Sequence, residues 1–435
     1  MSTATNQEAF DLDRAHVFHS WSAQATLNPL VVERAEGCNV YDREGNRYLD
    51  FSSQLVNVNI GHSHPKVVKA IQEQAATLAT IAPQHAVMVR GEAAKRIVEK
   101  AGPHFQKVFF TNGGADANEN AIRAARLYTG KNKILSTYRS YHGNTGSAIV
   151  ATGDWRRMPN EYSMHHAHFF GPFAYRSEFW STSPEEESAR ALHHLERIIQ
   201  AEGPQTIAAV LLESIPGTAG ILIPPPGYLE GVRALCDKYG ILWIADEVMC
   251  GFGRTGHWFA HQVFGVTPDL ITFAKGVNSG YVPVGGVIFP ESLAQYFDDK
   301  VFPGGLTYSG HPLAMASIVA ALDAMDEEGI VDNAKRVGET VLGPGLRALQ
   351  SRHSIIGDVR GMGVFWALDL VADPVTKAPI DAAMVGRLKA LLLEHRMLGF
   401  LAENRLHVVP PLTVTDAEVA EGLDILEKVF TALTR

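Results

Sequence analysis

The sequence predicts an α/β protein in which a large domain holds a mostly parallel central sheet covered by helices. Its 435 residues exceed what one simple core holds and indicate two or three domains. Short apolar runs bounded by Gly, Asn or Asp alternate with helical patterns such as 65–78 and 93–100. Fully apolar strands separated by helices are typical of a parallel sheet covered on both faces. The apolar runs are 107–110, 133–136, 208–212, 241–245 and 270–273.

The two ends of the chain have a different pattern and predict a second, smaller domain. An alternation of apolar and polar residues with a Glu-Gly-Asn turn within 38–50 predicts a hairpin. A helical stretch at about 314–349 precedes a strand-like run at 363–368 and further helical sequence. The predicted domains are a large one at 61–325 and a small α+β one built from 1–60 and 326–435.

Composition and charge exclude several classes of protein. A formal net charge of −9 argues against nucleic acid or an acidic membrane surface as a partner. Cys38, Cys236 and Cys250 lack the spacing of a metal site, and in a chain of this size they indicate buried thiols rather than a disulfide framework. Residues 1–14 lack an apolar signal segment, and no apolar run has membrane length. We therefore expect a cytoplasmic protein with no metal.

Polar groups follow four of the apolar runs directly or within two residues. In parallel sheets, ligands bind where the strands end at their carboxyl termini. The groups that follow the runs should therefore converge on one site. They are 111–114, Glu213, 246–247 and Lys275.

Lys275 ends an apolar run and is followed by small residues. Desolvation there would lower the pKa of its amine toward the nucleophilic range. A single lysine in such a position is more often a solvated loop residue, so the argument depends on its companions. Asp246, just beyond another apolar strand, suits a buried pyridinium partner, although a helix N-cap is the alternative. Gly113 and Gly114 open a helix after a strand and could bring backbone amides to an anion, although Gly-Gly is also common in turns.

In combination, these segments resemble the class III aminotransferases, enzymes of fold type I that depend on pyridoxal 5′-phosphate (PLP). The resemblance covers the chain from about Trp21 to Pro411. Its most specific part is the D-E-V-x-x-G-F-G-R-T-G segment that begins at Asp246, with Lys275 downstream. Further segments resemble the family's phosphate cup, its ring-stacking segment and its inter-subunit phosphate segment. These are 112–117, 140–143 and 307–312.

The resemblance implies a role for each matched residue. Lys275 would form the Schiff base with PLP and move the proton during catalysis, and Asp246 would pair with the pyridine nitrogen. Tyr141 and Val248 would enclose the ring, with His142 beside them in the stacking segment. Glu213 matches a glutamate of the family that lies close to the cofactor, with a purely structural cap as the alternative.

For the phosphate, the resemblance implies a cup shared between two subunits. Gly113, Gly114 and Ala115 would supply backbone N–H groups, because the hydroxyls that relatives usually carry there are absent from this sequence. Thr307 would complete the cup from the other subunit. A homodimer, or a tetramer of such dimers, with active sites at the subunit interface is therefore expected.

Departures from the family pattern indicate the substrate. Met249 replaces a common glutamine and resembles the ω-amino acid:pyruvate subgroup, and Thr218 replaces a gating glutamate, which favours pyruvate as acceptor. Phe400 occupies the usual position of the carboxylate-binding arginine. Arg405 is the nearest candidate for that role, with a surface arginine at a strand start as the alternative. Other expected substrate contacts are Trp21, Val56 and Tyr141.

The resemblance thus implies an aminotransferase that moves an amino group from an ω-amino acid or primary amine to a 2-oxo acid, with pyruvate favoured, by a ping-pong mechanism. An amino-acid racemase or epimerase, or an aminomutase, on the same fold is the alternative, because Lys275 could return a proton to either face or carbon. A catalytically silent PLP-binding protein is disfavoured by the intact set of Lys275, Asp246 and Tyr141.

Overall fold

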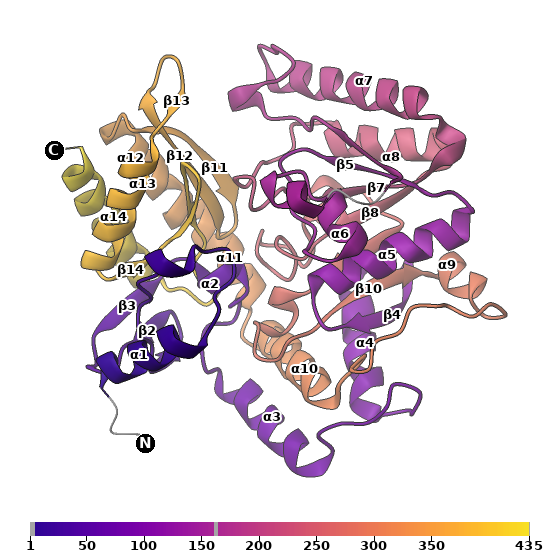
Figure 1. Cartoon of the computed structure of the whole chain (residues 1–435), viewed down its shortest axis with the longest axis horizontal. Coiled ribbons are helices and arrows are strands. Elements are labelled where there is room, and N and C mark those ends of the chain that lie inside the picture. Colours follow the sequence, from indigo (N-terminus) through magenta and orange to yellow (C-terminus); the bar gives the residue numbers. More distant parts are fainter. Residues whose placement is uncertain (1–4, 161–163, 435) are drawn as a thin grey trace.

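The computed structural model describes residues 5–160 and 164–434 and shows two lobes (Figure 1). The larger lobe contains a seven-stranded sheet in the order β4-β10-β9-β8-β7-β5-β6. The neighbours from β9 to β6 pair in parallel, whereas β10 runs antiparallel to both β4 and β9. The predicted, mostly parallel sheet is therefore confirmed. The strands are β4 Phe105–Thr111, β5 Lys133–Thr137, β6 His166–Phe169, β7 Ile207–Glu213, β8 Leu242–Asp246, β9 Leu270–Phe273 and β10 Gly285–Pro290.

Helices cover both faces of this sheet because successive side chains in a strand point to opposite faces. On one face, Leu211 and Ile244 pack in an apolar cluster with residues of α5. On the other face, Val210 and Trp243 pack with residues of α7 and α8, as the positions of these helices show (Figure 1). Burial on both faces explains why β7 and β8 are apolar up to the acidic residues at their carboxyl ends. The helices of this lobe are α3 Pro65–Thr77, α4 Met88–Ala101, α5 Gly114–Thr129, α6 Gly146–Ala151, α7 Pro184–Glu202, α8 Tyr228–Tyr239 and α9 Glu291–Tyr296.

The smaller lobe joins the two ends of the chain (Figure 1). Strands β2 and β3 form the predicted hairpin, and β14 from the C-terminal part pairs in parallel with β3. A second sheet has the order β11-β12-β16-β15, with β13 at its edge. The division at residues 61 and 325 stays a prediction. The strands are β1 Arg34–Glu36, β2 Asn39–Tyr41, β3 Arg47–Asp50, β11 Ile356–Met362, β12 Phe365–Asp373, β13 Ala378–Pro379, β14 Met397–Leu398, β15 Phe400–Ala402 and β16 Arg405–Val408.

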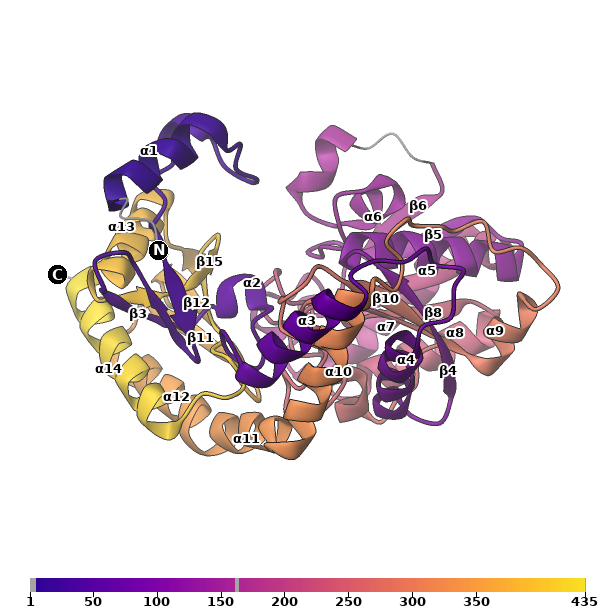
Figure 2. The same ribbon diagram turned by 90° about the horizontal axis from the view of Figure 1, so that it is seen from below.

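The long helical stretch expected at about 314–349 is divided in the structure. Gly329 adopts a left-handed conformation with φ of 61°, which ends one helix and starts the next. Figure 2 shows these helices running from the large lobe to the small one. Among the described residues, no helix is long and apolar enough to cross a membrane. The remaining helices are α1 Asn6–His16, α2 Ser53–Val56, α10 Pro312–Glu327, α11 Ile330–Val337, α12 Gly343–Arg352, α13 Ala382–Glu394 and α14 Asp416–Leu433.

Candidate active site

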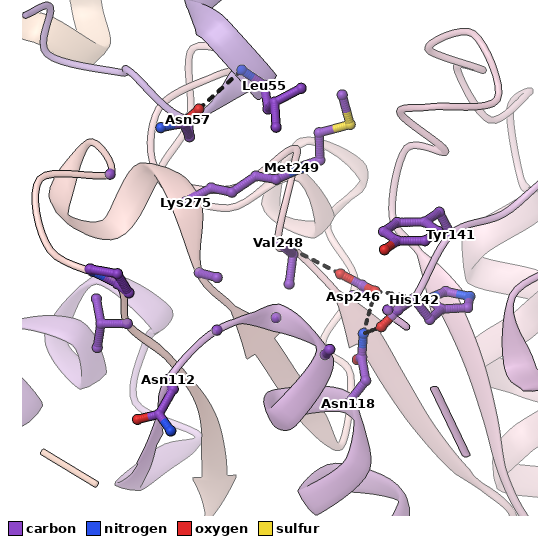
Figure 3. Close-up of a pocket in the computed structure, with 18 of the residues that line it drawn as sticks. Leu55, Asn57, Asn112, Asn118, Tyr141, His142, Asp246, Val248, Met249 and Lys275 are labelled. Carbon is purple, nitrogen blue, oxygen red and sulfur yellow. Dashed lines mark hydrogen bonds and ion pairs between the residues drawn. The ribbon is translucent and has the colours of Figure 1, made fainter. Parts of the chain in front are cut away.

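A cavity of about 370 Å³ lies at the carboxyl ends of the parallel strands. Figure 3 shows the side chains that project into it from several strand ends. The structure brings the four polar groups of the sequence together here, because the strands that carry them are neighbours or near neighbours in one sheet. The lining includes Asn112, Gly113, Gly114, Ala115, Tyr141, His142, Glu213, Asp246, Val248 and Lys275.

Asp246 is a buried carboxylate held by three donors at the end of β8. Its Oδ2 accepts hydrogen bonds from Asn118 Nδ2 at 2.8 Å and pairs with His142 Nδ1 at 2.8 Å. Its Oδ1 accepts from the backbone N–H of Val248 at 3.0 Å. Oδ1 therefore keeps acceptor capacity on the cavity side (Figure 3). A buried carboxylate that is fixed in this way fits a protonated pyridine nitrogen.

Asn118 belongs to this site, although the sequence analysis did not single it out. It lies on α5, and its Oδ1 accepts a hydrogen bond from Thr272 Oγ1 at 2.8 Å, which fixes the direction of its amide. The signal in the sequence is a polar residue on a helix face that otherwise buries alanines such as Ala117 and Ala121. A buried amide among apolar neighbours needs partners, and here the main partner is Asp246.

We expect Asn118→Ala to lower kcat by about tenfold or more, the loss typical of removing an outer hydrogen-bond partner of a functional group. Stability should fall by about 1–3 kcal/mol, because Thr272 and Asp246 each lose a buried partner. Steady-state kinetics and thermal unfolding measure the two effects. Asn120→Ala is the matched control, since the side chain of Asn120 on the same helix bonds Asp116 and Arg123 and no other side chain among the described residues. Equal kinetics in the two variants would contradict a role for Asn118 in holding Asp246.

Lys275 begins just after β9, with a φ of 46°, and extends across the cavity beside Met249 (Figure 3). Burial lowers the pKa of Lys275, whereas the carboxylates of Glu213 and Asp246 act in the opposite direction. In the described part of the chain, no hydrogen-bond acceptor holds its Nζ. An amine that is partly desolvated and unpaired can take up its neutral, nucleophilic form.

The N-terminus of α5 forms the opposite end of the cavity. A Cβ atom on Gly114 would lie 2.9 Å from Val248 Cγ1, so the absence of a side chain lets the helix approach the Asp246 segment closely. The free N–H groups of the first helical turn and the helix dipole favour an anion there. Thr307, by contrast, is exposed on the turn after residue 306 and does not line the cavity of its own chain.

The carboxylate of Glu213 accepts hydrogen bonds from backbone N–H groups. It accepts hydrogen bonds from the N–H groups of Tyr141 at 3.0 Å and Gly217 at 2.8 Å. Burial raises the pKa of Glu213 to about 6, and the nearby Asp246 carboxylate acts in the same direction. Glu213 therefore positions Tyr141 and the loop that carries Thr218. These contacts are of the structural kind that was the alternative to a role beside the cofactor. The Glu213 side chain also lines the cavity.

A second cavity, of about 540 Å³, adjoins the first and shares Lys275 and Tyr141 with it. This outer pocket is lined by two of the expected substrate contacts, Trp21 and Arg405, and by Phe400, which takes the place of the family's arginine. Arg405 pairs through Nη1 with Glu403 at 2.7 Å, and its Nε is buried without a partner among the described residues. The outer pocket therefore has an aromatic wall and, at Arg405, a guanidinium with an N–H donor that has no partner among the described residues.

Val56 does not reach either cavity. It is 1% exposed and packs in an apolar cluster with Ile215 and Met249. The backbone at Gln54 and Val56 has positive φ values, of 60° and 57°. This kink turns Leu55 toward the pockets in place of Val56. Val56 is therefore not among the residues that line the two cavities, and its contact with substrate stays a prediction.

The sheet, the cavity at its carboxyl edge and the buried Lys275 and Asp246 that line it define a PLP-dependent enzyme of fold type I. The chain belongs to the class III aminotransferase family, whose model matches residues 21–430. It is 32% identical to a taurine–pyruvate aminotransferase of Bilophila wadsworthia, over 99% of this chain and 98% of the relative. It is 35% identical to a 5-aminovalerate aminotransferase of Pseudomonas aeruginosa, over 94% and 95%.

Solved structures agree with this assignment. The taurine:2-oxoglutarate aminotransferase of Bifidobacterium kashiwanohense, in complex with PLP and glutamate, is 43% identical, with a TM-score of 0.96 over 99% of both chains. An (S)-enantioselective ω-transaminase from Thermomicrobium roseum is 35% identical, with a TM-score of 0.95 over 100% of both chains. The predicted family, fold type, cofactor and aminotransferase activity are therefore confirmed, and the racemase alternative is not favoured.

Proposed function

We propose that this enzyme moves an amino group from an ω-amino acid or a primary amine to a 2-oxo acid in a ping-pong reaction through Lys275. The observation that carries the proposal is the unpaired Lys275 amine between the buried Asp246 carboxylate and an outer pocket that contains arginine. Bound PLP supplies an electron sink for the charge that develops when the substrate carbon loses its proton. Residues of this chain would hold that group and move the proton.

Each residue has a distinct task in this proposal. Nζ of Lys275 takes the proton from one carbon and returns it to another. The Asp246 carboxylate keeps the ring nitrogen protonated, while Asn118 and His142 keep the carboxylate in place. The ring would lie between Tyr141 and Val248. The N–H groups of 113–115 would bind the phosphate at the N-terminus of α5.

For the acceptor, we propose that Arg405 binds the carboxylate of the 2-oxo acid, because an unpaired anion in a partly dry pocket is costly. Thr218 and the pyruvate-dependent relative support pyruvate as an acceptor, whereas the relative from Bifidobacterium kashiwanohense is named for 2-oxoglutarate. The proposed donors have their amine at the end of the carbon chain. Taurine, β-alanine, 4-aminobutyrate and simple primary amines are the candidates.

A panel of donors and acceptors tests this function. PLP-loaded enzyme is mixed with each amine in the absence of a 2-oxo acid, and loss of the cofactor's absorbance band is recorded. Single 2-oxo acids are then added, and recovery of the band and formation of the amino acid product are measured. We expect ω-amino acids to bleach the band and pyruvate to restore it with formation of alanine. Bleaching by α-amino acids alone, or racemisation without keto-acid product, would refute the proposal.

We propose that the enzyme is a cytoplasmic homodimer, or a tetramer of such dimers, in which Thr307 serves the phosphate site of the partner subunit. The support is the exposure of Thr307 outside its own cavity. Ser309 on the same turn bonds the backbone oxygen of Phe110 at 2.7 Å, which anchors the segment next to β4. A firmly held turn that presents an exposed hydroxyl suits a contribution to a neighbouring subunit.

A mixed dimer tests this sharing of the site. One subunit carries Thr307→Ala and the other carries Lys275→Ala. If Thr307 acts across the interface, both changes damage the same site, and about half of the wild-type activity remains in the other. Thr307→Ala alone should weaken cofactor binding by about 1–3 kcal/mol, because a charged acceptor loses a donor. Activity of the mixed dimer well below half would show that Thr307 acts within its own chain.

A further inference from the structure

Arg254, in the segment between β8 and β9, is a fully buried arginine. Its guanidinium donates hydrogen bonds to the backbone oxygen of Pro410 and to Ser53 Oγ, the latter at 3.3 Å. Within residues 5–160 and 164–434, no carboxylate pairs with it and its Nε has no partner. Burial lowers the pKa of Arg254 to about 9. A buried cation without an anion is costly, which indicates a specific role for this side chain.

A further partner of Arg254 is the buried side chain of Asn59, which lies against the turn that carries Lys275. Nη2 of Arg254 donates to Asn59 Oδ1 at 2.8 Å, and Asn59 Nδ2 donates to the backbone oxygen of Phe252 at 2.7 Å. Both ends of the Asn59 amide are therefore fixed. A Cβ atom on Gly276 would lie 2.3 Å from Asn59 Nδ2, so the amide touches the backbone of the residue that follows Lys275.

The turn at Lys275 has an unusual backbone conformation. Lys275 has a φ of 46° and Ser279 has a φ of 59°, in the left-handed region that a residue with a Cβ atom adopts at a cost in free energy. Such a turn persists when its surroundings hold it in place. Asn59 packs against its start, and the backbone N–H of Ile60 donates to Ser279 Oγ at its end, at 3.1 Å. The turn is therefore held by neighbouring residues of the N-terminal part of the chain.

We propose that Arg254 is a positioning residue for the reaction, which acts through Asn59 to hold the turn of Lys275 and so directs the lysine side chain into the cavity. The inference rests on the proposed role of Lys275. Arg254 itself lines neither cavity, so its effect is indirect. Because its guanidinium also binds Ser53 and Pro410, from the two ends of the chain, the orientation of the lysine depends on how the two lobes are joined.

Arg254→Lys and Asn59→Ala test this connection in the full-length, PLP-loaded enzyme. The lysine keeps the charge but lacks the fork of donors that binds several partners at once, and the alanine removes the amide beside Gly276. Hydrogen exchange of the backbone amides in 275–280, measured by mass spectrometry, should become about tenfold faster or more in both variants. We expect kcat to fall about tenfold, as for loss of an outer hydrogen-bond partner, and the KM of the most active donor of the panel to change by less than about twofold.

Arg176→Gln is the matched control, because Arg176 is another arginine that joins the lobes. Its guanidinium pairs with Asp369 of β12 at 2.7 Å and with the backbone oxygen of Lys377, and it lines neither cavity. The control variant should be less stable than the wild type, with unchanged exchange in 275–280 and unchanged kcat.

Two results would overturn the proposal and show that Arg254 only joins the lobes. One is wild-type exchange in 275–280 and wild-type kcat in Asn59→Ala, which decides the matter even if Arg254→Lys does not fold. The other is a change in Arg176→Gln as large as that in Arg254→Lys.

The double variant Arg254→Lys/Asn59→Ala tests whether the arginine acts through the asparagine. Its kcat should be close to that of the slower single variant, because two changes in one chain of contacts are not additive. Losses that multiply would show that the two residues act separately, contrary to the proposal. Failure of the proposed function is distinct, because borohydride reduction would then place the cofactor on a peptide without Lys275, whereas the difference in exchange would persist.

Discussion

Replacing Lys275 with alanine is expected to abolish transamination, with a rate loss of about 10⁴-fold or more. No other lysine lines either cavity, so among the described residues no amine can replace the lost Nζ. The variant should still bind PLP, because the proposed phosphate and ring contacts remain, but without covalent attachment. Activity is measured with the best donor and acceptor, and attachment by borohydride reduction followed by peptide mass spectrometry.

Lys238→Ala is the control for this experiment. Lys238 pairs with Glu196 at the surface, at 2.6 Å, and lines neither of the two cavities. Its replacement should change activity by no more than about twofold, as is usual for surface substitutions. In the wild-type enzyme, the reduced cofactor should appear on the peptide that contains Lys275. Its appearance on any other peptide would refute the role of Lys275.

Asp246→Asn is expected to lower kcat on the order of a hundredfold or more, the scale of losing a preorganised charged group. The asparagine cannot keep the ring nitrogen protonated, and its amide would place a second set of donors near Asn118 Nδ2 and His142 Nδ1. PLP content should fall much less than activity, since the phosphate contacts are unaffected. Steady-state kinetics and the ratio of bound cofactor to protein measure the two quantities.

Asp326→Asn provides the comparison for Asp246, because Asp326 is an exposed aspartate whose carboxylate, within residues 5–160 and 164–434, pairs with Lys100 alone, at 2.6 Å. Its kcat should equal that of the wild type. Near-normal turnover of Asp246→Asn would show that another acid holds the ring. A loss of cofactor in proportion to the loss of activity would instead show that Asp246 serves binding rather than catalysis.

The central sheet could be predicted in large part, because strands buried on both faces leave a local signature. The runs at β4, β5, β7, β8 and β9 are apolar and bounded by turn formers. Strand β10 carries less of that signature, since it begins with Gly285 and Gly286 and ends with Pro290. Its antiparallel place between β4 and β9 follows from sheet pairing, which local periodicity does not encode.

Contacts between segments explain the residues that the sequence analysis missed or misplaced. Asn118 meets Asp246 across 128 positions of the chain. Val56 was expected to contact substrate, whereas Leu55, beside it at a backbone kink, is the residue that lines the cavity. In each case the decisive quantity is the direction of a side chain, which depends on the order of the strands and on unusual backbone angles.

The family, the cofactor and the class of reaction could be predicted from the amino-acid sequence, because the groups that carry the chemistry follow buried strands within short, specific segments. Lys275 and Asp246 are recognisable for this reason. Which side chains surround them depends on the fold, as the Asn118 and His142 contacts to Asp246 and the place of Arg405 in the outer pocket show. Periodicity is a local property of the sequence, whereas contacts between distant side chains depend on how strands and lobes pack in space.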